Sequence, residues 1–440
     1  MQAVLLAAGE SSRFFPLNLK HKCLVKIAGE SLISHTVRAV KRAGITDITI
    51  VTGNNRNFQD VLGNGKKFGV KIRYVIQEKP TGAGDALIVA SKFLTGDFFL
   101  VNSNHVEFDE LKHAIDLNRG TNKEPVLLAT PEPSQRKFGA LKINGDRVLE
   151  ISEKPKSSRG FSNLRIVGVY FLNQDFVKTL KKIPSTHYSL ENALDKYAKE
   201  KRVLLALTNH KILSLKYPWD LLNIKNYILS KQKRSISKKA RIAGNAQIDG
   251  SVVIEEGAQV LENAVIKGPC YIGRNVFIGS NSLVRDGSDI EESAVIGAYM
   301  EVRGSLILEG TKTHSGFIGD SVLGQNSKIG ALFGTANVRL DRANVRSVVN
   351  GEKIDTGFGS LGAIIGDNVV IGERVSTMPG ITIGNNAIIG PSTTVMRNVD
   401  SDTTFYTKFA EFVEEKKTLP ARLDKAMAKR AGRYGRPKRS

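Results

Sequence analysis

The chain has 440 residues, 41% of them hydrophobic and 24% charged, which is enough for two or three domains with full cores. Its two cysteines imply no disulfide framework, and the apolar start at residues 3–8 is too short for a membrane span and lacks the charged segment of a signal peptide. These features exclude a small disulfide-rich secreted protein. They favour a cytoplasmic protein without a membrane partner.

Two stretches carry much of the net charge of +21. Residues 231–241 hold six lysines and arginines with no acid, and residues 416–440 hold ten with one acid. Such runs are typical of nucleic-acid or membrane attachment. Since no nucleic-acid-binding motif accompanies them, we favour a solvated tail together with positively charged clefts for phosphorylated substrates. A tail that associates with nucleic acid is retained as a third hypothesis for function.

Apolar, strand-like runs alternate with helical patterns in the first half of the chain. Strands are predicted at residues 4–7, 48–51, 72–76, 98–101 and 126–129. A helix capped by Ser31 and closed by Gly44, and another over residues 83–94, separate several of them. This order predicts a mostly parallel sheet with helices on both faces, in which ligands bind beyond the carboxyl ends of the strands. The loop at residues 9–22, after the first strand, is therefore the first place to expect a site.

An aliphatic residue occupies every sixth position in the middle of the chain. The series is Ile242, Ile248, Ile254, Val260, Ile266, Ile272, Ile278, Val284, Ile290, Ile296, Val302 and Leu308. Neither the helical period of 3.6 nor the strand period of 2 produces this spacing, which is typical of a parallel β-helix whose coils bury a ladder of side chains. The register breaks after Leu308, is disrupted again through residues 337–359, and returns from Ile365 onward. Such breaks predict projecting loops, which often carry function.

The chain therefore divides into four predicted parts. Two helical patterns, near residues 190–198 and 219–229, close the first half. We predict an α/β domain over residues 1–230, a basic linker over 231–241, a β-helix over 242–400, and a helical, basic C-terminal tail over 401–440. The chemical motifs of the chain lie in the first and third of these parts.

The loop after the first strand carries a phosphate-binding pattern. Residues 6–17 read LAAGESSRFFPL, and Lys22 follows downstream. A turn of small residues lets backbone N–H groups approach phosphate oxygens, while Arg13 and Lys22 neutralise a triphosphate during attack at its α-phosphate. This segment resembles the signature of sugar-1-phosphate nucleotidyltransferases. The resemblance implies a Rossmann-like α/β domain with Arg13 and Lys22 as catalytic cations. It also implies that Ala8 and Gly9 bind the nucleotide.

Further segments are similar to motifs of the same family. Residues 77–86 resemble its base-binding segment, which implies that Gln77 and Gly82 contact the nucleobase. Residues 217–220 read YPWD and match the end of the family's domain. The resemblance therefore extends over the whole first half of the chain.

Four residues stand in segments similar to the family's sugar-phosphate motifs. Gly139, Glu153 and Lys154 belong to two short motifs, and Tyr170 belongs to a strand motif. The resemblance implies that all four bind the sugar phosphate. The alternative for Glu153 and Lys154 is a simple surface turn, and the alternative for Tyr170 is a residue of the core.

The positions that hold Mg²⁺ in this family lack their carboxylates here. Asn104, after the strand predicted at 98–101, stands in place of one aspartate, and Ser214 stands in place of the other. Mg²⁺ prefers charged oxygen ligands, which an amide and a hydroxyl replace poorly. Metal stabilisation of a phosphoryl transition state is worth several kcal/mol, so losing it could lower the rate on the order of a thousandfold or more.

Three explanations for these substitutions stay open. Lys216, which replaces a glycine of the family motif, could supply the positive charge itself. His105, Glu107 or Asp109 could hold a metal differently. Or the domain could bind a nucleotide or sugar phosphate without turning it over. A Mg²⁺ cofactor is therefore an open expectation.

The first break in the sixfold repeat contains a second set of motifs. Residues 312–321 read KTHSGFIGDS, and residues 330–339 read GALFGTANVR. Both segments are similar to motifs of the left-handed β-helix acetyltransferase domain in bifunctional UDP-N-acetylglucosamine pyrophosphorylase/glucosamine-1-phosphate N-acetyltransferases, most closely the archaeal form. The resemblance covers roughly residues 1–400 in the same domain order. It implies hexapeptide repeats, acetyl-CoA as co-substrate, and a homotrimer or higher homo-oligomer.

Acetylation of an amino sugar requires a base, because the amine is mostly ammonium at neutral pH. Histidine, with an ordinary pKa near ~6.5, suits that task, and His314 is the candidate. The alternative is a structural histidine at a coil corner. By resemblance, Asn337 holds the acceptor or polarises the acetyl carbonyl. Arg339 and Arg346 offer charge for the acceptor phosphate.

Together these motifs predict an enzyme of nucleotide-sugar synthesis. The α/β domain is expected to transfer a nucleotidyl group from a nucleoside triphosphate to a sugar 1-phosphate with release of pyrophosphate. The β-helix is expected to acetylate glucosamine 1-phosphate from acetyl-CoA, so that UDP-N-acetylglucosamine is the product. The alternative is a nucleotide-sugar-binding or regulatory homologue with weakened catalysis, which the replacement of both metal-binding aspartates favours.

Overall fold

The computed structural model describes residues 1–54, 56–119, 123–132, 140–152 and 161–414. The described residues up to 406 form one compact unit, and residues 407–414 do not belong to it. These last described residues contain no helix or strand. No helix in the described part of the chain is long and apolar enough to span a membrane.

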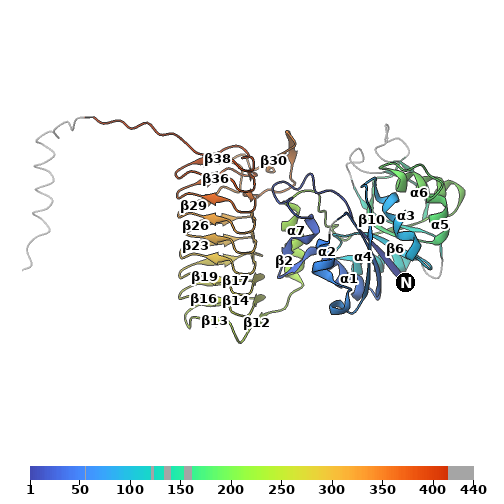
Figure 1. Ribbon diagram of the computed structural model, residues 1–440, viewed down its shortest axis with the longest axis horizontal. Coiled ribbons are helices and arrows are strands. Elements are labelled where there is room, and N and C mark those ends of the chain that lie inside the picture. Colours follow the sequence, from blue (N-terminus) through green and yellow to red (C-terminus); the bar gives the residue numbers. More distant parts are fainter. Residues whose placement is uncertain (55, 120–122, 133–139, 153–160, 415–440) are drawn as a thin grey trace, which may run out of the picture. The chain divides into compact units, whose positions relative to one another are not determined.

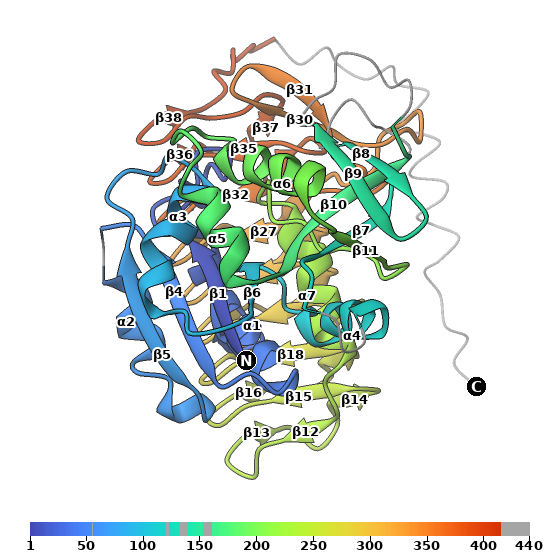
Figure 2. The ribbon, with the colours of Figure 1, turned by 90° about the vertical axis from the view of Figure 1, so that its right-hand side faces the viewer.

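A nine-stranded sheet forms the centre of the N-terminal domain (Figure 2). Its strands are, in spatial order, β5 (Lys71–Ile76), β4 (Asp47–Thr52), β1 (Gln2–Ala7), β6 (Phe98–Asn102), β10 (Leu164–Leu172), β7 (Val126–Pro131), β11 (Leu204–Leu207), β9 (Arg147–Ser152) and β8 (Ala140–Asn144). The first four pair in parallel, as predicted, whereas β10 runs antiparallel to β6 and β7. Because β1 and β6 are parallel neighbours, the loops that follow them leave from the same edge of the sheet.

Helices cover both faces of this sheet, which confirms the predicted α/β architecture. One core cluster holds side chains of α1 (Leu32–Arg42), α2 (Asn57–Leu62), α4 (Phe108–Arg119) and α7 (Asp220–Ser230). A second cluster holds those of α3 (Ala83–Ala90), α5 (Gln174–Leu180) and α6 (Ser189–Glu200), the helices nearest the viewer in Figure 2. Alternate residues of β1 fall in the two clusters, with Ala3 and Leu5 in the first and Val4 in the second, as side chains on opposite faces of a strand must.

Three parallel sheets, stacked coil upon coil, form the β-helix (Figure 1). The first sheet contains β12 (Ser235–Ile236), β15 (Val252–Ile254), β18 (Cys270–Ile272), β21 (Asp289–Ile290), β24 (Leu306–Ile307), β27 (Val322–Leu323), β32 (Ile364–Ile365) and β35 (Thr382–Ile383). The second contains β13 (Arg241–Ile242), β16 (Gln259–Val260), β19 (Phe277–Ile278), β22 (Val295–Ile296), β25 (Lys312–Thr313), β28 (Lys328–Ile329), β33 (Val370–Ile371), β36 (Ile388–Ile389) and β38 (Thr404–Phe405). The third contains β14 (Gln247–Asp249), β17 (Val265–Lys267), β20 (Leu283–Arg285), β23 (Met300–Arg303), β26 (Gly316–Gly319), β29 (Phe333–Thr335), β34 (Ser376–Thr377) and β37 (Thr394–Val395).

The regular coils confirm the predicted ladder. Partner residues lie 18 positions apart, as with Ile248 and Ile266, so one coil places six residues along each sheet. Every residue of the sixfold series from Ile254 to Val302 is buried. The period of six thus follows from three equal sides around one apolar interior.

Two irregularities interrupt the stack where the sequence predicted breaks. Ile290 pairs with Ile307 rather than with Leu308, because this coil is one residue shorter. The last position of the predicted ladder was therefore wrong: Leu308 packs in the cluster shared with the N-terminal domain. Further on, Leu323 pairs directly with Ile365. The chain between them carries the projecting hairpin of β30 (Arg346–Val349) and β31 (Glu352–Asp355).

The boundaries of the β-helix differ from those predicted. β12 already belongs to its first sheet, so the stack begins inside the stretch taken as a linker, residues 231–241. Ile236 shows why, since it lies six positions before Ile242 and is in register with the series. At the other end, β38 extends the stack beyond residue 400. The prediction of a helical tail is wrong for residues 407–414, which contain no helix. The rest of the predicted tail, 415–440, lies outside the described residues.

The first sheet of the β-helix packs against the N-terminal domain. Tyr271 and Leu306 share one apolar cluster with residues of α1, α4 and α7. Ala28 N donates a 2.7 Å hydrogen bond to Asp289 Oδ2, and the N–H of the next residue donates a 3.0 Å bond to Glu291 Oε1. Both carboxyl groups are fully buried, and burial raises the pKa of each. The two halves therefore share a core.

Candidate functional site

The loop after β1 lines a cavity of about 340 Å³. Ala8, Gly9 and Gln77, three of the four residues predicted to bind the nucleotide, lie in its wall. No atom lies within 4 Å of the position that a Cβ would take at Gly9, so the backbone there is open to an approaching phosphate. The fold therefore assembles three of the predicted nucleotide-binding residues in one place.

The fourth predicted residue, Gly82, supports this cavity without lining it. Gln77 Nε2 donates hydrogen bonds to Gly82 O at 3.0 Å and to Asp85 Oδ2 at 2.9 Å, which fixes the buried Gln77 side chain. Gly82 has a φ of +122°, and a Cβ on it would lie 2.6 Å from His187 O. Only glycine fits here. Its observed role is to let α3 begin next to Gln77.

Lys22 and His21 lie at the C-terminal end of the same loop, residues 9–22. Lys22 Nζ donates a 2.7 Å hydrogen bond to Leu215 O, and Lys22 N donates a 3.2 Å bond to Ser11 Oγ. Burial lowers the pKa of Lys22, and the charge of Arg13 lowers it further. Burial also lowers the pKa of His21 to about 4, so its imidazole is neutral near pH 7. The loop thus presents cations at residues 13 and 22 beside a neutral ring.

A second cavity, of about 280 Å³, shares this loop with β6, β10 and residues 212–216. Its wall contains four cationic side chains and both positions expected at the metal: Arg13, Lys22, Arg165, Lys216, Asn104 and Ser214. No carboxylate lines the cavity among the residues that the structure describes. The two expected metal positions therefore meet, but positive charge surrounds them.

The side chains of Asn104 and Ser214 both form hydrogen bonds within the protein, one to the segment before α7 and the other to the first residue of α7. Asn104 Nδ2 donates a 3.0 Å hydrogen bond to Leu213 O. The carboxylate of Asp220 accepts a bond from the Ser214 side chain and a 2.6 Å bond from Lys216 N. Burial raises the pKa of Asp220, and these hydrogen-bond donors partly offset that rise because they stabilise the carboxylate. Together the contacts hold residues 213–216 against β6.

The other side chains proposed to hold a metal do not converge. The buried Glu107 Oε1 accepts a 3.2 Å hydrogen bond from Leu213 N and lies 3.1 Å from His105 Nδ1. Asp109 forms a 2.7 Å ion pair with Arg42 of α1. Within the described ranges, no group of three His, Cys, Asp or Glu side chains is placed to hold a metal ion.

The residues predicted to bind the sugar phosphate are only partly visible. Gly139, Glu153 and Lys154 lie outside the described residues. Tyr170 lies in β10 within the second core cluster and is 8% exposed, so it contributes to the core whatever else it does. Its sugar-phosphate role stays a prediction.

Gly168, which stands in the strand motif of Tyr170, and Arg165 line the second cavity, although neither was assigned a role there from the sequence. A Cβ at Gly168 would lie 1.8 Å from Asn102 Nδ2, so a glycine is required where β10 passes β6. A glycine inside a strand-like run is a usable signal of such close approach. Arg165, which also lies in β10 and forms a 3.8 Å ion pair with Glu132, belongs to no motif that would have marked it.

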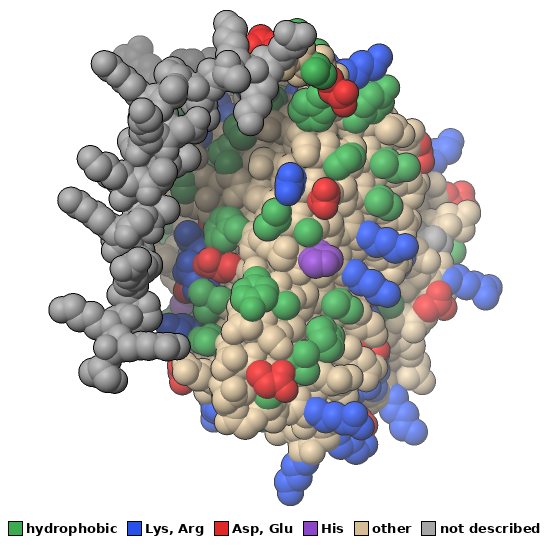
Figure 3. All heavy atoms as spheres, turned by 90° about the vertical axis from the view of Figure 1, so that its left-hand side faces the viewer, with side chains coloured by type: hydrophobic (Ala, Val, Ile, Leu, Met, Phe, Trp, Pro, Cys, Tyr) green, Lys and Arg blue, Asp and Glu red, His purple; other side chains and the backbone are tan. Residues whose placement is uncertain are grey.

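His314 lies at the corner between β25 and β26 and is exposed. It is the only histidine in the sequence after residue 210. Figure 3 shows the outer face of the β-helix, where hydrophobic side chains lie scattered among charged ones. His314 N donates a 3.0 Å hydrogen bond to Ile329 O of the next coil, so the backbone is fixed while the ring is accessible.

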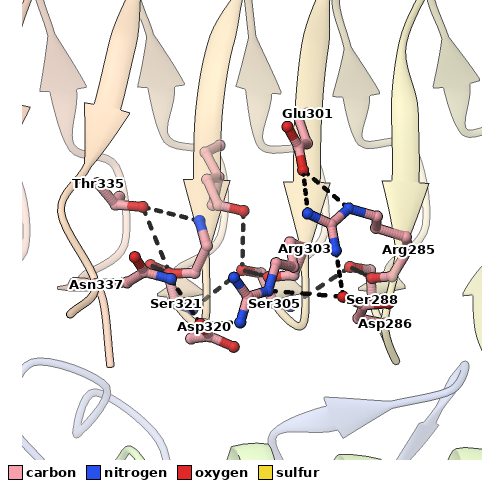
Figure 4. A network of polar contacts seen from close by, with 12 residues as sticks. Arg285, Asp286, Ser288, Glu301, Arg303, Ser305, Asp320, Ser321, Thr335 and Asn337 are labelled. Atoms are coloured by element: carbon pink, nitrogen blue, oxygen red, sulfur yellow. Dashed lines mark hydrogen bonds and ion pairs between the residues drawn. The ribbon is translucent and has the colours of Figure 1, made fainter. Parts of the chain in front are cut away.

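Asn337 is held by a polar network along one corner of the β-helix (Figure 4). Its Nδ2 donates a 2.7 Å hydrogen bond to Asp320 Oδ2, and Arg303 forms a 3.5 Å ion pair with the same carboxylate. The Phe317 ring lies close to the Asn337 amide over Gly319, because a Cβ at Gly319 would lie 2.6 Å from the ring and 2.8 Å from Asn337 Nδ2. The Asn337 side chain is therefore positioned before any substrate binds.

The two arginines predicted to bind the acceptor phosphate lie in the segment that interrupts the β-helix. Arg339 Nε donates a 2.8 Å hydrogen bond to Asp341 Oδ1, which it would have to exchange for a phosphate. Arg346 begins β30 with an exposed side chain. Their role stays a prediction.

Known proteins resemble both halves of the chain. The family model described as nucleotidyl transferase matches residues 2–221, the bacterial transferase hexapeptide model (six repeats) matches 362–397, and the hexapeptide repeat of succinyl-transferase matches 269–298. The bifunctional protein GlmU of Methanococcus maripaludis is 32% identical over 414 residues, which cover 93% of this chain and 98% of that protein. The bifunctional sugar-1-phosphate nucleotidylyltransferase/acetyltransferase of Sulfurisphaera tokodaii is 32% identical over 412 residues, covering 91% and 98%. The chain belongs to this family of bifunctional transferases.

Family membership confirms the predicted architecture, a nucleotidyltransferase domain followed by a left-handed β-helix of hexapeptide repeats. It also implies a divalent metal in the first site, which the residues present can be tested against. Mg²⁺ binds charged oxygen ligands. Asn104 and Ser214 offer neutral groups that already bond to Leu213 and Asp220, in a cavity lined by cations. These residues do not fit a protein-bound Mg²⁺.

Proposed function

We propose that this chain forms UDP-N-acetylglucosamine by two reactions at two separate sites. The β-helix would acetylate glucosamine 1-phosphate from acetyl-CoA, and the N-terminal domain would transfer uridylyl from UTP to the resulting sugar phosphate. The observation that carries the proposal is the union of both sites in one chain that matches bifunctional relatives over 98% of their length. Those relatives are bifunctional by name, which favours activity over a purely regulatory role.

The first reaction site offers phosphate-binding groups suited to nucleotidyl transfer. A phosphate oxygen of the sugar 1-phosphate attacks the α-phosphorus of the nucleotide, the bond to the β-phosphate breaks, and pyrophosphate leaves. The turn at Ala8 and Gly9 offers open backbone to the phosphates. Arg13 and Lys22 bring fixed positive charge to the oxygens that gain negative charge in the transition state.

The second reaction site has a base and a fixed amide. His314 would accept a proton from the ammonium group of the amino sugar, and the free amine would then attack the thioester carbonyl of acetyl-CoA. The carbon–sulfur bond breaks, and the thiolate leaves as CoA after taking up a proton. Asn337, held by Asp320, would direct its amide at the acceptor or the acetyl oxygen.

Assays of the two released products test the proposal. Pyrophosphate release should require both UTP and N-acetylglucosamine 1-phosphate, and Arg13→Ala should abolish it, whereas the exposed Arg147→Ala should not. CoA release should require glucosamine 1-phosphate, and His314→Ala should abolish it without changing thermal stability, whereas the exposed His113→Ala should have no effect. Measurable nucleotide binding without pyrophosphate release would instead support the regulatory alternative.

We also propose a cytoplasmic homotrimer or higher homo-oligomer. Both cysteines are free and buried, which suits a reducing compartment. Large apolar side chains on the β-helix surface, such as Tyr299 at 71% and Leu332 at 60% exposure, suit contacts with a second copy. Light scattering of the purified chain tests the assembly, and a monomer at micromolar concentration would contradict it.

A further inference from the structure

The second cavity of the N-terminal domain has the chemistry of an anion site. Arg13, Lys22, Arg165 and Lys216 line it, and no described carboxylate does. Arg13, Lys22 and Lys216 form no ion pair within the described residues. Positive charges gathered around one small space repel one another, and a polyanion between them removes that repulsion.

The backbone around Lys216 is fixed so that its side chain adds to this charge. Asp220 accepts a 2.6 Å hydrogen bond from Lys216 N, and the Asn104 amide holds Leu213 O at 3.0 Å on the same segment. An aspartate at residue 104 could not make that bond, because a carboxylate has no N–H to donate to a carbonyl oxygen. Asn104, which stands where the family has a metal-binding aspartate, thus helps to hold the segment that carries Lys216.

Lys22 contributes a charge that is costly unless an anion is present. Its ammonium is held by Leu215 O at 2.7 Å, and burial lowers its pKa. Leu215 and Lys216 are neighbours in the chain before α7, so this bond brings Lys22, from the loop after β1, to the segment that carries Lys216, and both lysines line the cavity.

We propose that Lys216, with Lys22 and Arg13, binds the pyrophosphate moiety of the nucleotide in place of a protein-bound divalent cation. The inference rests on the proposed nucleotidyl transfer for the identity of the ligand. It makes Lys216 a phosphate-binding residue that the family motif, with glycine at this position, does not supply.

Titration of the full chain with inorganic pyrophosphate in EDTA tests this inference. Wild-type protein should bind without any divalent metal, and Lys216→Met should weaken binding about tenfold or more, the usual effect of one charge-assisted hydrogen bond. Lys211→Met is the matched control, because Lys211 lies on the same stretch of chain, is exposed, bonds to Asn223 and does not line the cavity. Its affinity for pyrophosphate should equal that of the wild type.

A second variant keeps the test decisive if Lys216→Met fails to fold. The double change Asn104→Asp with Ser214→Asp restores both carboxylates and should lower pyrophosphate affinity in EDTA at least tenfold, by adding negative charge to the cavity. Binding that appears only when Mg²⁺ is added, or equal affinity of wild type and Lys216→Met, would overturn the inference. Pyrophosphate binding as expected without turnover of UTP would refute the proposed function alone, while turnover without binding in EDTA would refute this inference alone.

Discussion

Lys225 offers a quantitative test of how the two halves are joined. It lies on α7, is fully buried, and its Nζ donates hydrogen bonds to Asn226 Oδ1 at 2.8 Å and to Gly287 O of the β-helix. It is also the positive neighbour of the buried Asp289, which lies in the same interface. Lys225→Met keeps the length of the side chain and removes the charge and both hydrogen bonds.

The expected loss of stability follows from these contacts. Leaving the buried Gly287 carbonyl without its donor costs about 1–3 kcal/mol. Asp289 also loses its positive neighbour, which adds a smaller cost because the two side chains are not in direct ion-pair contact. Because burial also lowers the pKa of Lys225, the native charge is itself unfavourable, which offsets some of the loss. We expect a net decrease of about 2 kcal/mol in the free energy of unfolding near pH 8.

The same loss should shrink in mild acid. Burial raises the pKa values of Asp289 and Glu291, so above about pH 4 the folded protein keeps protons that the unfolded chain releases, and wild-type stability falls as pH rises toward neutrality. Without the positive charge of Lys225 the pKa of Asp289 rises further, and the fall extends to higher pH. The difference between variant and wild type should therefore be larger at pH 8 than at pH 5.

Urea unfolding at both pH values measures these differences. Trp219 is the only tryptophan, is buried next to α7 and stacks on Tyr217 at 4.6 Å, so its fluorescence follows the N-terminal domain. Lys231→Met is the matched control, because this lysine caps the C-terminus of α7 but is 60% exposed and makes a 2.8 Å ion pair with Glu110, worth about 0–1 kcal/mol. Equal stability of Lys225→Met and wild type, or a loss independent of pH, would refute the reasoning.

Two further predictions concern the interface and the second site. Gly29→Ala should destabilise the protein by about 2 kcal/mol or more, because Gly29 has a φ of +80° and a Cβ there would lie 2.2 Å from Tyr271 Oη. Gly44→Ala is the control for the backbone part of that cost, because Gly44 has a φ of +81° and open space around the Cβ position. Equal losses in the two variants would show that the contact with Tyr271 is unimportant. Asn337→Asp should lower CoA release about tenfold or more while leaving pyrophosphate release unchanged, since it places a second carboxylate against Asp320; unaltered CoA release would remove Asn337 from the acetyl-transfer site.

The sequence predicted the β-helix well because its signal is periodic and local. A ladder such as Ile266, Ile272 and Ile278 needs only the repeat of three equal sides, and each of these residues is buried as expected. The errors arose where one residue is missing from a coil, since Leu308 then leaves the ladder and Ile307 replaces it. A period alone cannot show where a coil is shortened. It also could not show that Ile236 starts the stack inside a strongly basic stretch.

Among the candidate site residues too, those that belong to local motifs could be predicted, whereas those brought in only by the fold could not. Arg13 and Lys22 belong to one local motif, and the structure places them together as predicted. Asn104 and Ser214 line the same cavity, and the sequence could single them out because one follows a recognisable strand and the other precedes a recognisable helix. Arg165 was missed because it reaches the cavity only through the place of β10 in the sheet, next to β6 and β7, which no local pattern encodes.

The decisive measurement is pyrophosphate release by the purified full chain from UTP and N-acetylglucosamine 1-phosphate. Release that depends on both substrates and disappears in Arg13→Ala, but not in Arg147→Ala, is the result expected if the cation-lined loop still supports nucleotidyl transfer. Absence of release above background, at substrate concentrations where nucleotide binding is saturated, would contradict it.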